Sequence, residues 1–530
     1  MMTRVSLHLR LLSFAMVLLG IHSVALAQDE PPPKTIITVN TTTDPSPDIR
    51  YRTCSYNSGA LYIASTPCSL RRALIEASGR PTTDRPILIQ FNIPTSDPGY
   101  DSVTGAWTLT IDGALLPLRR DNTLEKIGQV TIDGSTQPGG RTDGPRIIVD
   151  TNGWSLEIQS EQNTIRNISW KGGGIITLSG DNNVVENIWM GLTDDGQSLA
   201  LRTPSDPARL AGGGIHVRGA KNIIRNNVIT GSKSRAIIIE GSNNEVRGNW
   251  IGTRADGTVP DVIPLLKCLR NPTYEPLNWY GGWGIQVSGS NNRIIGNRIA
   301  GLHQTQTANE TPPMALEIFG TNHTIQDNVI GVDSAGKEVG VCGQGIKVAG
   351  TGTKILSNQV VGSRNGFENT RSAILVNDSS PMFGQITIRQ NIIKDGPALA
   401  IEMGPAIPTT LKLFKPAKIT SLNGLMVTGT SGDNSPCPLC TVDLYLDDTD
   451  STQEALQHLG SVQADANGNF TLMLSEPLPA GHGIRTGSTT LFTGVIGNYG
   501  GGTSTALSDV VYLPAATLSH TQLKTQKGVR

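Results

Sequence analysis

Charged side chains recur at one position of a short repeated phrase, and any catalysis would have to begin with them. The phrase is Gly-Ile-x-Val-x-Gly, found at 214–219, 284–289 and 345–350, with looser copies from Gly174, Ala236, Ala315 and Ala373. Its variable position holds, in chain order, His216, Ile238, Gln286, Glu317, Lys347, Leu375 and Glu402. A lyase needs a base beside a uronate carboxylate and a cation to neutralise that carboxylate. Lys347 or His216 could be the base, and Glu317 could help to hold an ion.

A structural role explains the same residues more simply. Glu317 and Lys347 stand one repeat apart, so we expect a surface ion pair, and we expect His216 to be a solvated surface residue. Glu317 and Glu402 are three repeats apart, about 14 Å at the spacing of stacked strands. Paired catalytic carboxylates of glycosidases lie only roughly 5–9.5 Å apart. The pair therefore does not suit a hydrolase.

Aromatic residues gather where the repeat is interrupted. Trp189 and Trp250 precede the first two insertions, and the second insertion ends in Trp279, Tyr280 and Trp283. Flat aromatic faces beside polar loop residues suit sugar rings or a partner's side chains, although the rings could also pack beneath their own loops. These five residues are the candidate binding residues.

Acidic residues crowd a third segment, with Asp443, Asp447, Asp448 and Asp450 close together. Oxygen-rich clusters can hold calcium, but this spacing matches no known calcium loop, and a solvated turn explains it equally. Calcium is the one cofactor for which the sequence offers ligands, and no cofactor is required by it.

The repeat that positions these residues has two strands or more. The glycine phrase leads into a second phrase, Ile-x-x-Asn-x-Val, which recurs around Asn249, Asn328, Asn358 and Asn391. Alternating Ile and Val point to one side of a strand, and a unit of about 20–30 residues is typical of a β-helix coil. Other asparagines recur three residues after the glycine, namely Asn183, Asn222, Asn244 and Asn292. We interpret these asparagines as structural, bonding to their equivalents in the coils above and below.

Three insertions leave from the same point of the repeat, at 192–212, 253–283 and 332–343, and should project from one edge. Six cysteines suggest disulfides in an exported chain. Local pairing joins Cys54 to Cys68 and Cys437 to Cys440, which leaves Cys268 to tie to Cys342 between two insertions. A Cys-x-x-Cys pair can also mark redox or metal chemistry, but no second pair or histidine cluster completes a zinc site here.

The N-terminal part reads as an export signal followed by a cap. Residues 1–27 combine Arg4 and Arg10, an apolar core and a small-residue cleavage site. The region 28–100 should then cap the coil, with a first strand at 35–40 and an amphipathic helix at 69–78 that Ser69 can begin. Such a helix would cover the open apolar end of the coil.

These segments resemble a known family. Segment 68–73 is similar to the Cys-Ser-Leu-Arg-Glu-Ala (CSLREA) segment that precedes right-handed parallel β-helices in many secreted bacterial proteins, and 130–139 resembles that family's first rung. The resemblance covers roughly residues 35–515 and implies the fold more than a function. Arg72 stands where the family has Glu, which removes the capping box and should weaken the helix start.

The expected architecture is all-β: a right-handed parallel β-helix over 101–408, then an Ig-like antiparallel β-sandwich over 411–514, where the strand pattern changes to one of alternating strands and tight turns. The residues 515–530 should be a disordered tail. We expect the protein to be a monomer.

Composition narrows the partners. Removing the two arginines of the signal from 43 basic residues leaves 41 against 44 acidic ones, and no basic run could follow a phosphate backbone. We therefore expect no nucleic acid partner, and no membrane span after signal removal. The leading hypothesis is a secreted or cell-surface protein that binds a polysaccharide or a cell-surface component without catalysis. The alternatives are a polysaccharide lyase or epimerase acting on acidic glycans, and a spacer whose sandwich domain binds.

Overall fold

The predicted export signal and C-terminal tail lie outside the described residues. The computed structural model describes residues 31–44, 54, 67–115, 117–119, 128–200, 213–232, 235–259, 283–302, 314–364, 372–377, 385–396, 398–404, 414–431, 437–490, 504–509 and 511–512.

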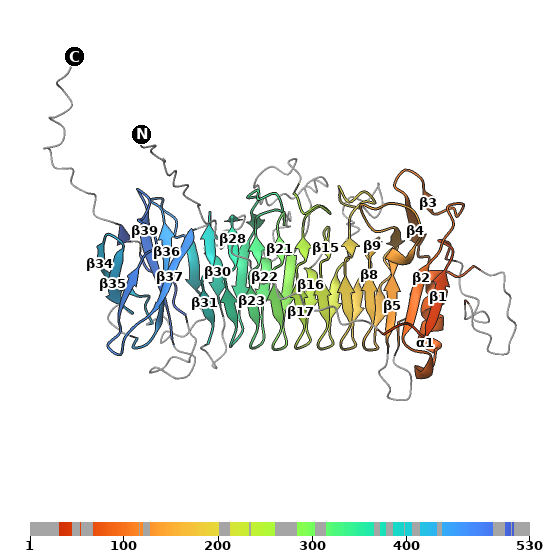
Figure 1. The fold of residues 1–530 in the computed structure, drawn as a ribbon, viewed down its shortest axis with the longest axis horizontal. Helices are drawn as coiled ribbons and strands as arrows, with labels where there is room; N and C mark the ends of the chain where they lie inside the picture. The colour runs from red at the N-terminus through yellow and green to blue at the C-terminus, as the bar shows by residue number, and fades with distance from the viewer. Residues whose placement is uncertain are drawn as a thin grey trace, which may run out of the picture.

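Three long sheets run along the described chain (Figure 1). In stacking order, the first sheet contains β1 (Thr35–Val39), β2 (Ile87–Phe91), β5 (Val130–Asp133), β8 (Thr164–Arg166), β11 (Val184–Glu186), β14 (Ile223–Arg225), β17 (Glu245–Arg247), β20 (Arg293–Ile295), β23 (Thr324–Gln326), β27 (Lys354–Leu356) and β31 (Thr387–Arg389). The second contains β3 (Tyr100–Asp101), β4 (Ala106–Thr110), β6 (Ile147–Asp150), β9 (Ile168–Lys171), β12 (Trp189–Met190), β15 (Val228–Ile229), β18 (Trp250–Ile251), β21 (Arg298–Ile299), β24 (Val329–Ile330), β28 (Gln359–Val361) and β32 (Ile392–Lys394). The third contains β7 (Leu156–Ile158), β10 (Ile176–Leu178), β13 (Ile215–Val217), β16 (Arg235–Ile239), β19 (Trp283–Val287), β22 (Met314–Ile318), β26 (Gln344–Val348), β30 (Ser372–Val376) and β33 (Leu399–Met403).

The order of the strands is consistent with a parallel β-helix. The chain visits the first, second and third sheets in turn, and each strand then pairs with its equivalent one rung later. These pairs are parallel, except for the antiparallel β3–β4 pair. Because β1 and β2 already belong to the first sheet, the stack begins within the region predicted as the cap. The handedness of the coil stays a prediction.

The glycine phrase forms the third sheet as predicted. Ile346 and Val348 point inward and are fully buried, while Lys347 between them is partly exposed. The register aligns Ile346 with Leu316 below and Ile374 above, so that like side chains stack along the axis. Each fully buried aliphatic side chain contributes about 1.5–3 kcal/mol, and the stack joins these contributions into one continuous core.

Buried asparagines occupy two of the three corners, which confirms their predicted structural role. Asn163, Asn183, Asn222, Asn244 and Asn292 form a ladder between the third and first sheets. A second ladder between the first and second sheets contains Asn227, Asn249, Asn297, Asn328, Asn358 and Asn391. In the second ladder, the Nδ2 of Asn328 donates to Oδ1 of Asn358 at 2.9 Å and to the carbonyl of Ile294 at 2.8 Å. The ladders thus bond the polar groups that these tight corners bury.

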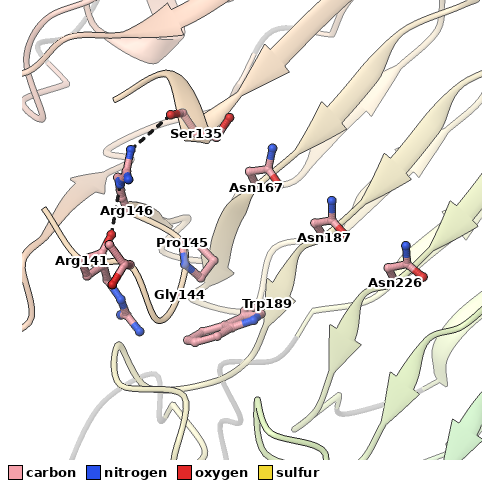
Figure 2. Close-up of a pocket in the computed structure, with 10 residues that line it drawn as sticks. Ser135, Arg141, Gly144, Pro145, Arg146, Asn167, Asn187, Trp189 and Asn226 are labelled. Atoms are coloured by element: carbon pink, nitrogen blue, oxygen red, sulfur yellow. Dashed lines mark hydrogen bonds between the residues drawn. The ribbon is translucent and has the colours of Figure 1, made fainter. Parts of the chain in front are cut away.

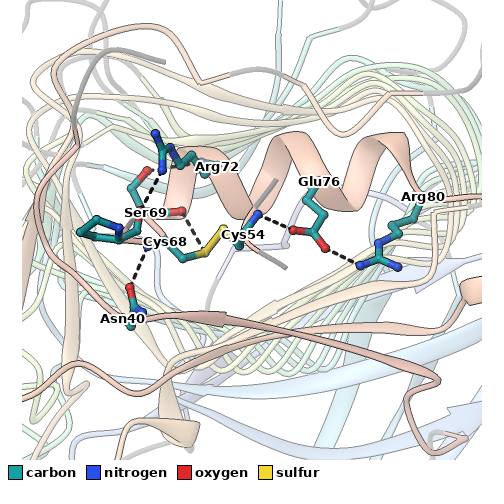
Figure 3. Close-up of a disulfide and its surroundings, with 8 residues drawn as sticks. Asn40, Cys54, Cys68, Ser69, Arg72, Glu76 and Arg80 are labelled. Carbon is teal, nitrogen blue, oxygen red and sulfur yellow. Dashed lines mark hydrogen bonds and ion pairs between the residues drawn. A yellow bond between two sulfur atoms is a disulfide. The ribbon is translucent and has the colours of Figure 1, made fainter. Parts of the chain in front are cut away.

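A helix covers the open N-terminal end of the stack. Helix α1 (Leu70–Gly79) matches the predicted span to within one residue, and Ser69 accepts a hydrogen bond from the N–H of Arg72. Leu74 and Ala77 are buried against the core. Arg72, which cannot complete a capping box, bonds elsewhere: its guanidinium donates to the carbonyl of Pro67 at 3.1 Å (Figure 3).

Polar contacts lock the cap in place. Arg71 forms a buried ion pair with Asp44, and the predicted disulfide joins Cys54 to Cys68. In Figure 3, the N–H of Cys54 donates to Glu76 at 2.6 Å, and Glu76 also pairs with Arg80 at 2.5 Å. Two short 3₁₀ turns, η1 (Thr82–Asp84) and η2 (Gly134–Thr136), lie between the strands that follow.

The C-terminal part forms two antiparallel sheets. One contains β34 (Lys418–Asn423), β35 (Met426–Thr430) and β38 (Asn469–Met473), and the other contains β37 (Gln457–Gln463), β36 (Thr441–Asp447), β39 (Gly483–Thr489) and β40 (Val511–Tyr512). These strands have a core of their own, which includes Val427, Leu444, Phe470 and Ile484. The predicted Cys437–Cys440 disulfide is present. The Ig-like topology stays a prediction.

These sheets close the other end of the stack. The backbone of Ile393 exchanges two hydrogen bonds of 2.9 Å with Ala455, and Arg389 makes a two-pronged ion pair with Asp443 at 2.7 and 2.8 Å. Tyr445 and Ala455 join the core of the coil itself. The described residues of the C-terminal part therefore cover this end of the stack and also have a core of their own.

The insertions leave the corner between the second and third sheets, which we call the loop corner. Its described loops are 192–200, 253–259 and 332–343. The last of these contains β25 (Val341–Cys342), which pairs with β29 (Ser363–Arg364). Cys342 is disulfide-bonded, and its predicted partner, Cys268, lies outside the described residues.

The second asparagine ladder should be essential for stability. Asn249 is fully buried and donates to Asn297 and Ile224, both at 2.9 Å, while accepting from Asn227. Asn249→Ala would leave several buried groups unbonded and should cost about 2–4 kcal/mol. Thermal unfolding followed by circular dichroism measures this loss, and Asn243→Gly, on an exposed turn, is the control. Equal midpoints for the two variants would contradict the structural role.

Candidate binding site

The loops at the loop corner stack on one another through their turns. The N–H of Ala255 donates to the carbonyl of Gly196 at 3.0 Å, and the N–H of Ser334 donates to that of Gly257 at the same distance. Gly196, Gly257 and Gly336 hold the equivalent position, and each has a positive φ of 72–80°. Because these loops follow alternate rungs, β12, β18 and β24, the turns reach across the intervening rungs to meet. The described loops therefore form a continuous wall above the second sheet.

Trp189 and Trp250 lie beneath this wall. They project outward from equivalent positions of the second sheet, two rungs apart with Val228 between them. A Cβ on Gly196 would approach the Trp189 ring to 2.8 Å, and one on Gly257 would approach the Trp250 ring to 2.7 Å. The rings thus pack under their own loops, although both remain partly exposed.

Trp283 lies apart from these two rings. It begins β19 in the third sheet, where the guanidinium carbon of Arg235 stands 4.0 Å above the ring centroid. The other candidates, Trp279 and Tyr280, lie outside the described residues. The structure therefore places two of the five predicted binding residues under the loop wall and one on the adjacent sheet.

A pocket of about 490 Å³ opens beside Trp189 (Figure 2). Its lining residues come from the segment before β6 and from three successive turns of the coil, and they are Ser135, Arg141, Thr142, Gly144, Pro145, Arg146, Asn167, Asn187, Trp189 and Asn226. Figure 2 shows Asn167, Asn187 and Asn226 in a row, one on each rung, with the Trp189 ring beside them. We call this site the Trp189 pocket.

Two arginines form one wall of the Trp189 pocket. Arg141 lies over the Trp189 ring, 5.1 Å from its centroid, and pairs with Asp143 at 3.1 Å. Arg146 donates to the backbone carbonyls of Arg141 and Gln137 at 3.1 and 2.8 Å. Sequence analysis missed both arginines because their segment precedes the regular repeat. Only an alignment of this segment with the later rungs would have placed the two arginines beside Trp189.

The asparagine row was also missed, although its signal is visible in the sequence. Asn167, Asn187 and Asn226 hold the equivalent turn position between the first and second sheets, and each has a φ between 52° and 59°. Left-handed backbone of this kind favours Gly or Asn. A row of Asn at such a position indicates a tight turn, and the structure has a tight turn at this position.

The structure confirms that the variable positions of the repeated phrase align in one column on the third sheet. His216, Ile238, Gln286, Glu317, Lys347, Leu375 and Glu402 are aligned on successive rungs. Glu317 and Glu402 are thus three rungs apart, as expected. His216 is not the solvated surface residue that we expected: its side chain is only 18% exposed, and its Nε2 lies 3.0 Å from a carboxylate oxygen of Glu240.

Glu317 is held by neighbours on both sides. Its carboxylate lies 3.2 Å from Nζ of Lys347, which confirms the predicted ion pair, and 3.5 Å from a guanidinium nitrogen of Arg235. Gln286 also donates to it at 3.3 Å. The side chain is only 8% exposed, so the pair is more buried than the predicted surface pair. Both charges of the proposed catalytic pair are therefore used within the sheet.

The acidic cluster separates into two groups. Asp443 is the partner of Arg389 at the domain junction: burial opposes its ionisation, but hydrogen bonds from Arg389, His458 and Ser461 lower its pKa to about 2. The carboxylates of Asp447 and Asp448 lie together with that of Glu454, within 4.8 Å of one another.

This group fits calcium poorly. Asp447 is the ion-pair partner of Arg485 and accepts from the N–H of Asp448 at 3.0 Å, while Glu454 accepts from the N–H of Asp395 at 2.6 Å. Calcium takes six to eight oxygen ligands, and the oxygens of these three carboxylates are partly engaged. Asp450 bonds its own turn through Thr452, as in an ordinary solvated turn.

A scan of the chain against protein-family models finds no match, and a search among curated proteins finds no similar sequence. The resemblance of segments 68–73 and 130–139 to the CSLREA family therefore stays a prediction. None of the helices among the described residues has the length and apolar character needed to cross a membrane.

The contact between Trp250 and its loop can be tested with a matched pair of glycines. Gly257→Ala and Gly336→Ala introduce the same backbone strain, worth about 1–2 kcal/mol, because both residues have a φ near 80°. The Cβ at Gly257 would meet the Trp250 ring and the Cβ of Ser334, both at 2.7 Å, whereas the one at Gly336 has no atom within 4 Å. We expect Gly257→Ala to lose about 1–3 kcal/mol more, measured by thermal unfolding. Equal losses would mean that the ring does not support the turn.

The domain junction should weaken as pH rises. Burial raises the pKa of Glu454 to about 7; the N–H of Asp395 opposes this rise, and Asp450 and Asp448 add to it. The pKa of a glutamate in an unfolded chain is about 4.3. When the folded pKa is higher than this, the group's full contribution to the stability of the fold is present below about pH 4.3, and it is lost as the pH rises through the folded pKa of about 7. Glu454→Gln, which keeps an acceptor for Asp395, should remove most of this dependence.

Melting temperatures of the wild type and Glu454→Gln between about pH 5 and pH 8 provide the measurement. The difference between the two proteins should change across this range. Asp443 contributes no slope there, because the stability from its lowered pKa is lost only as pH falls through about 2. Parallel curves would show that Glu454 does not titrate in this window.

Proposed function

We propose that this is an exported, non-catalytic protein that binds a polysaccharide or a cell-surface component on the outer face of the second sheet, beside the loop corner, with the Trp189 pocket as its centre. The observation that carries the proposal is the pocket itself, in which an aromatic face stands beside side-chain amides and two guanidinium groups. Flat aromatic faces with a few polar groups suit sugar rings. The wall of stacked loops holds Trp189 in place, so the surface is rigid before a ligand arrives.

The charges of the third sheet favour binding over catalysis. A lyase base must have a free lone pair near the substrate, whereas Lys347 is paired with a nearly buried Glu317 that Arg235 also faces. The column then stabilises the sheet instead of acting on a substrate. For this reason we place the ligand at the Trp189 pocket on the second sheet and not over the column.

Export is part of the proposal. It rests on the signal-like segment 1–27 and on the Cys54–Cys68 and Cys437–Cys440 disulfides, which suit an oxidising compartment. We also propose the finer fold assignments implied by the resemblance, a right-handed coil and an Ig-like C-terminal sandwich. The two antiparallel sheets and their separate core support the latter.

Loss of the Trp189 ring should abolish most binding. Purified protein comprising residues 28–530 would be screened against immobilised glycans and bacterial surfaces, and its best ligand titrated by calorimetry. We expect Trp189→Ala to weaken affinity about tenfold or more. Trp154→Ala is the matched control, because Trp154 is 42% exposed and outside the pocket.

Two results would contradict the proposal. The first is that the Trp189→Ala variant binds every ligand found as tightly as the wild type does. The other is a calcium-dependent rise of ultraviolet absorbance when the protein is incubated with polyuronates, since that rise reports the unsaturated product of a lyase.

A further inference from the structure

We propose that the ligand of the Trp189 pocket is an anionic glycan that lies along the axis of the coil across the row of Asn167, Asn187 and Asn226. This inference rests on the proposed function and adds the chemical class and the direction of the ligand. The shared chemistry is an extended sugar chain with carboxylate, sulfate or phosphate groups.

The asparagine row offers amides that the fold itself does not use. The side chains of Asn187 and Asn226 are exposed, and neither hydrogen-bonds to another described residue. Their turns are held by backbone bonds instead, from the N–H of Asn187 to Arg225 at 3.3 Å and from that of Asn226 to Arg247 at 3.2 Å. Asn167 is partly engaged, donating to Asp133 at 2.9 Å.

Later rungs show that this turn does not need an amide. The equivalent positions are Gly248 and Gly296, whose φ values of 63° and 62° match those of the asparagines. Glycine adopts this conformation without strain, so an asparagine there is dispensable for folding. Further along the axis the position holds Asp327, Ser357 and Gln390, so among the described rungs three amides stand on successive rungs only beside the pocket. Spaced by about 4.8 Å per rung, they can meet successive sugars of an extended chain.

The charge of the pocket favours an anion. Its ten lining residues include Arg141 and Arg146 but no Asp or Glu. Asp143 already balances Arg141. Arg146 bonds only to carbonyls of the backbone, and no described carboxylate pairs with it. An anionic substituent would supply the partner that this guanidinium lacks, and charge-assisted bonds of this kind are the strong ones.

The flanking acids do not cancel this preference. Asp133 pairs with Arg166, Glu186 with Arg225, and Asp194 with Lys171. Asp195 bonds to Thr193 and Gln197 within its own loop. Each nearby carboxylate thus has a partner, while Arg146 remains the uncompensated charge.

The decisive variant is Asn187→Gly with Asn226→Gly, because it removes two amides at positions where glycine preserves the backbone. Asn243→Gly is the matched control: Asn243 is exposed, has a φ of 59° and is not a lining residue of the pocket. Calorimetric titrations would use polygalacturonate, chondroitin sulfate and a phosphate-bearing teichoic acid, with dextran as the neutral chain. Thermal unfolding would accompany each variant.

We expect at least one of the anionic chains to bind and dextran to bind about tenfold more weakly or not at all. The double variant should lose about tenfold in affinity with its melting temperature within a few degrees of the control. Arg146→Gln should weaken binding of the anionic chain and reduce its dependence on salt. The three anionic probes also show which group is preferred.

The results separate this inference from the proposed function. Equal binding of dextran and the anionic chains, lost in Trp189→Ala, would uphold a glycan-binding pocket and overturn the anionic ligand. Anionic binding that the double glycine variant leaves intact would overturn the asparagine row as its track. Binding of none of these chains would overturn the inference, and the wider screen then decides whether the proposed function survives.

Discussion

The register between successive rungs is the constraint on which this structure depends. Each strand of the three sheets hydrogen-bonds to its equivalent one rung later, so an inward or corner position holds the same kind of residue on most rungs, whereas outward positions vary. Inward positions become continuous aliphatic columns such as the one through Leu316, Ile346 and Ile374. Corner positions become asparagine ladders. A single unsuitable residue therefore disturbs the packing of the rungs on both sides of it. This explains why the apolar positions of the Gly-Ile-x-Val-x-Gly phrase vary so little.

A stack of this kind has two open ends, and both are closed by charged contacts that hold an apolar cover in place. At the N-terminal end, helix α1 covers the core while Arg71 pairs with Asp44. At the other end, Tyr445 enters the core while Arg389 pairs with Asp443. Breaking either pair would leave a charge buried without a partner, which is costly. The caps are thus fixed in orientation as well as in position.

The repeat could be predicted from the sequence because its signals are local. The alternation of Ile346 and Val348 identifies a strand, and the spacing of Asn328 and Asn358 identifies the buried ladder. The register of Glu317 with Lys347 followed from the same repeat. By contrast, Arg235 reaches Glu317 across two rungs, and Arg146 enters the pocket from a segment without repeat character. No spacing rule connects such residues, because their contacts are set only when the stack is assembled.

The position of the pocket follows from the same constraint. Strand positions cannot vary freely, and two of the corners are filled by buried asparagines, so variation gathers at the loop corner and at exposed turns. Trp189 lies on the strand between these two regions and contacts both: its ring supports the turn at Gly196 and also lines the pocket. Removing the loop would therefore disturb the pocket, although the loop itself contributes no residue to its lining. The binding surface is then a product of the stack, in which a rigid repeated frame carries a few residues that its own stability does not require.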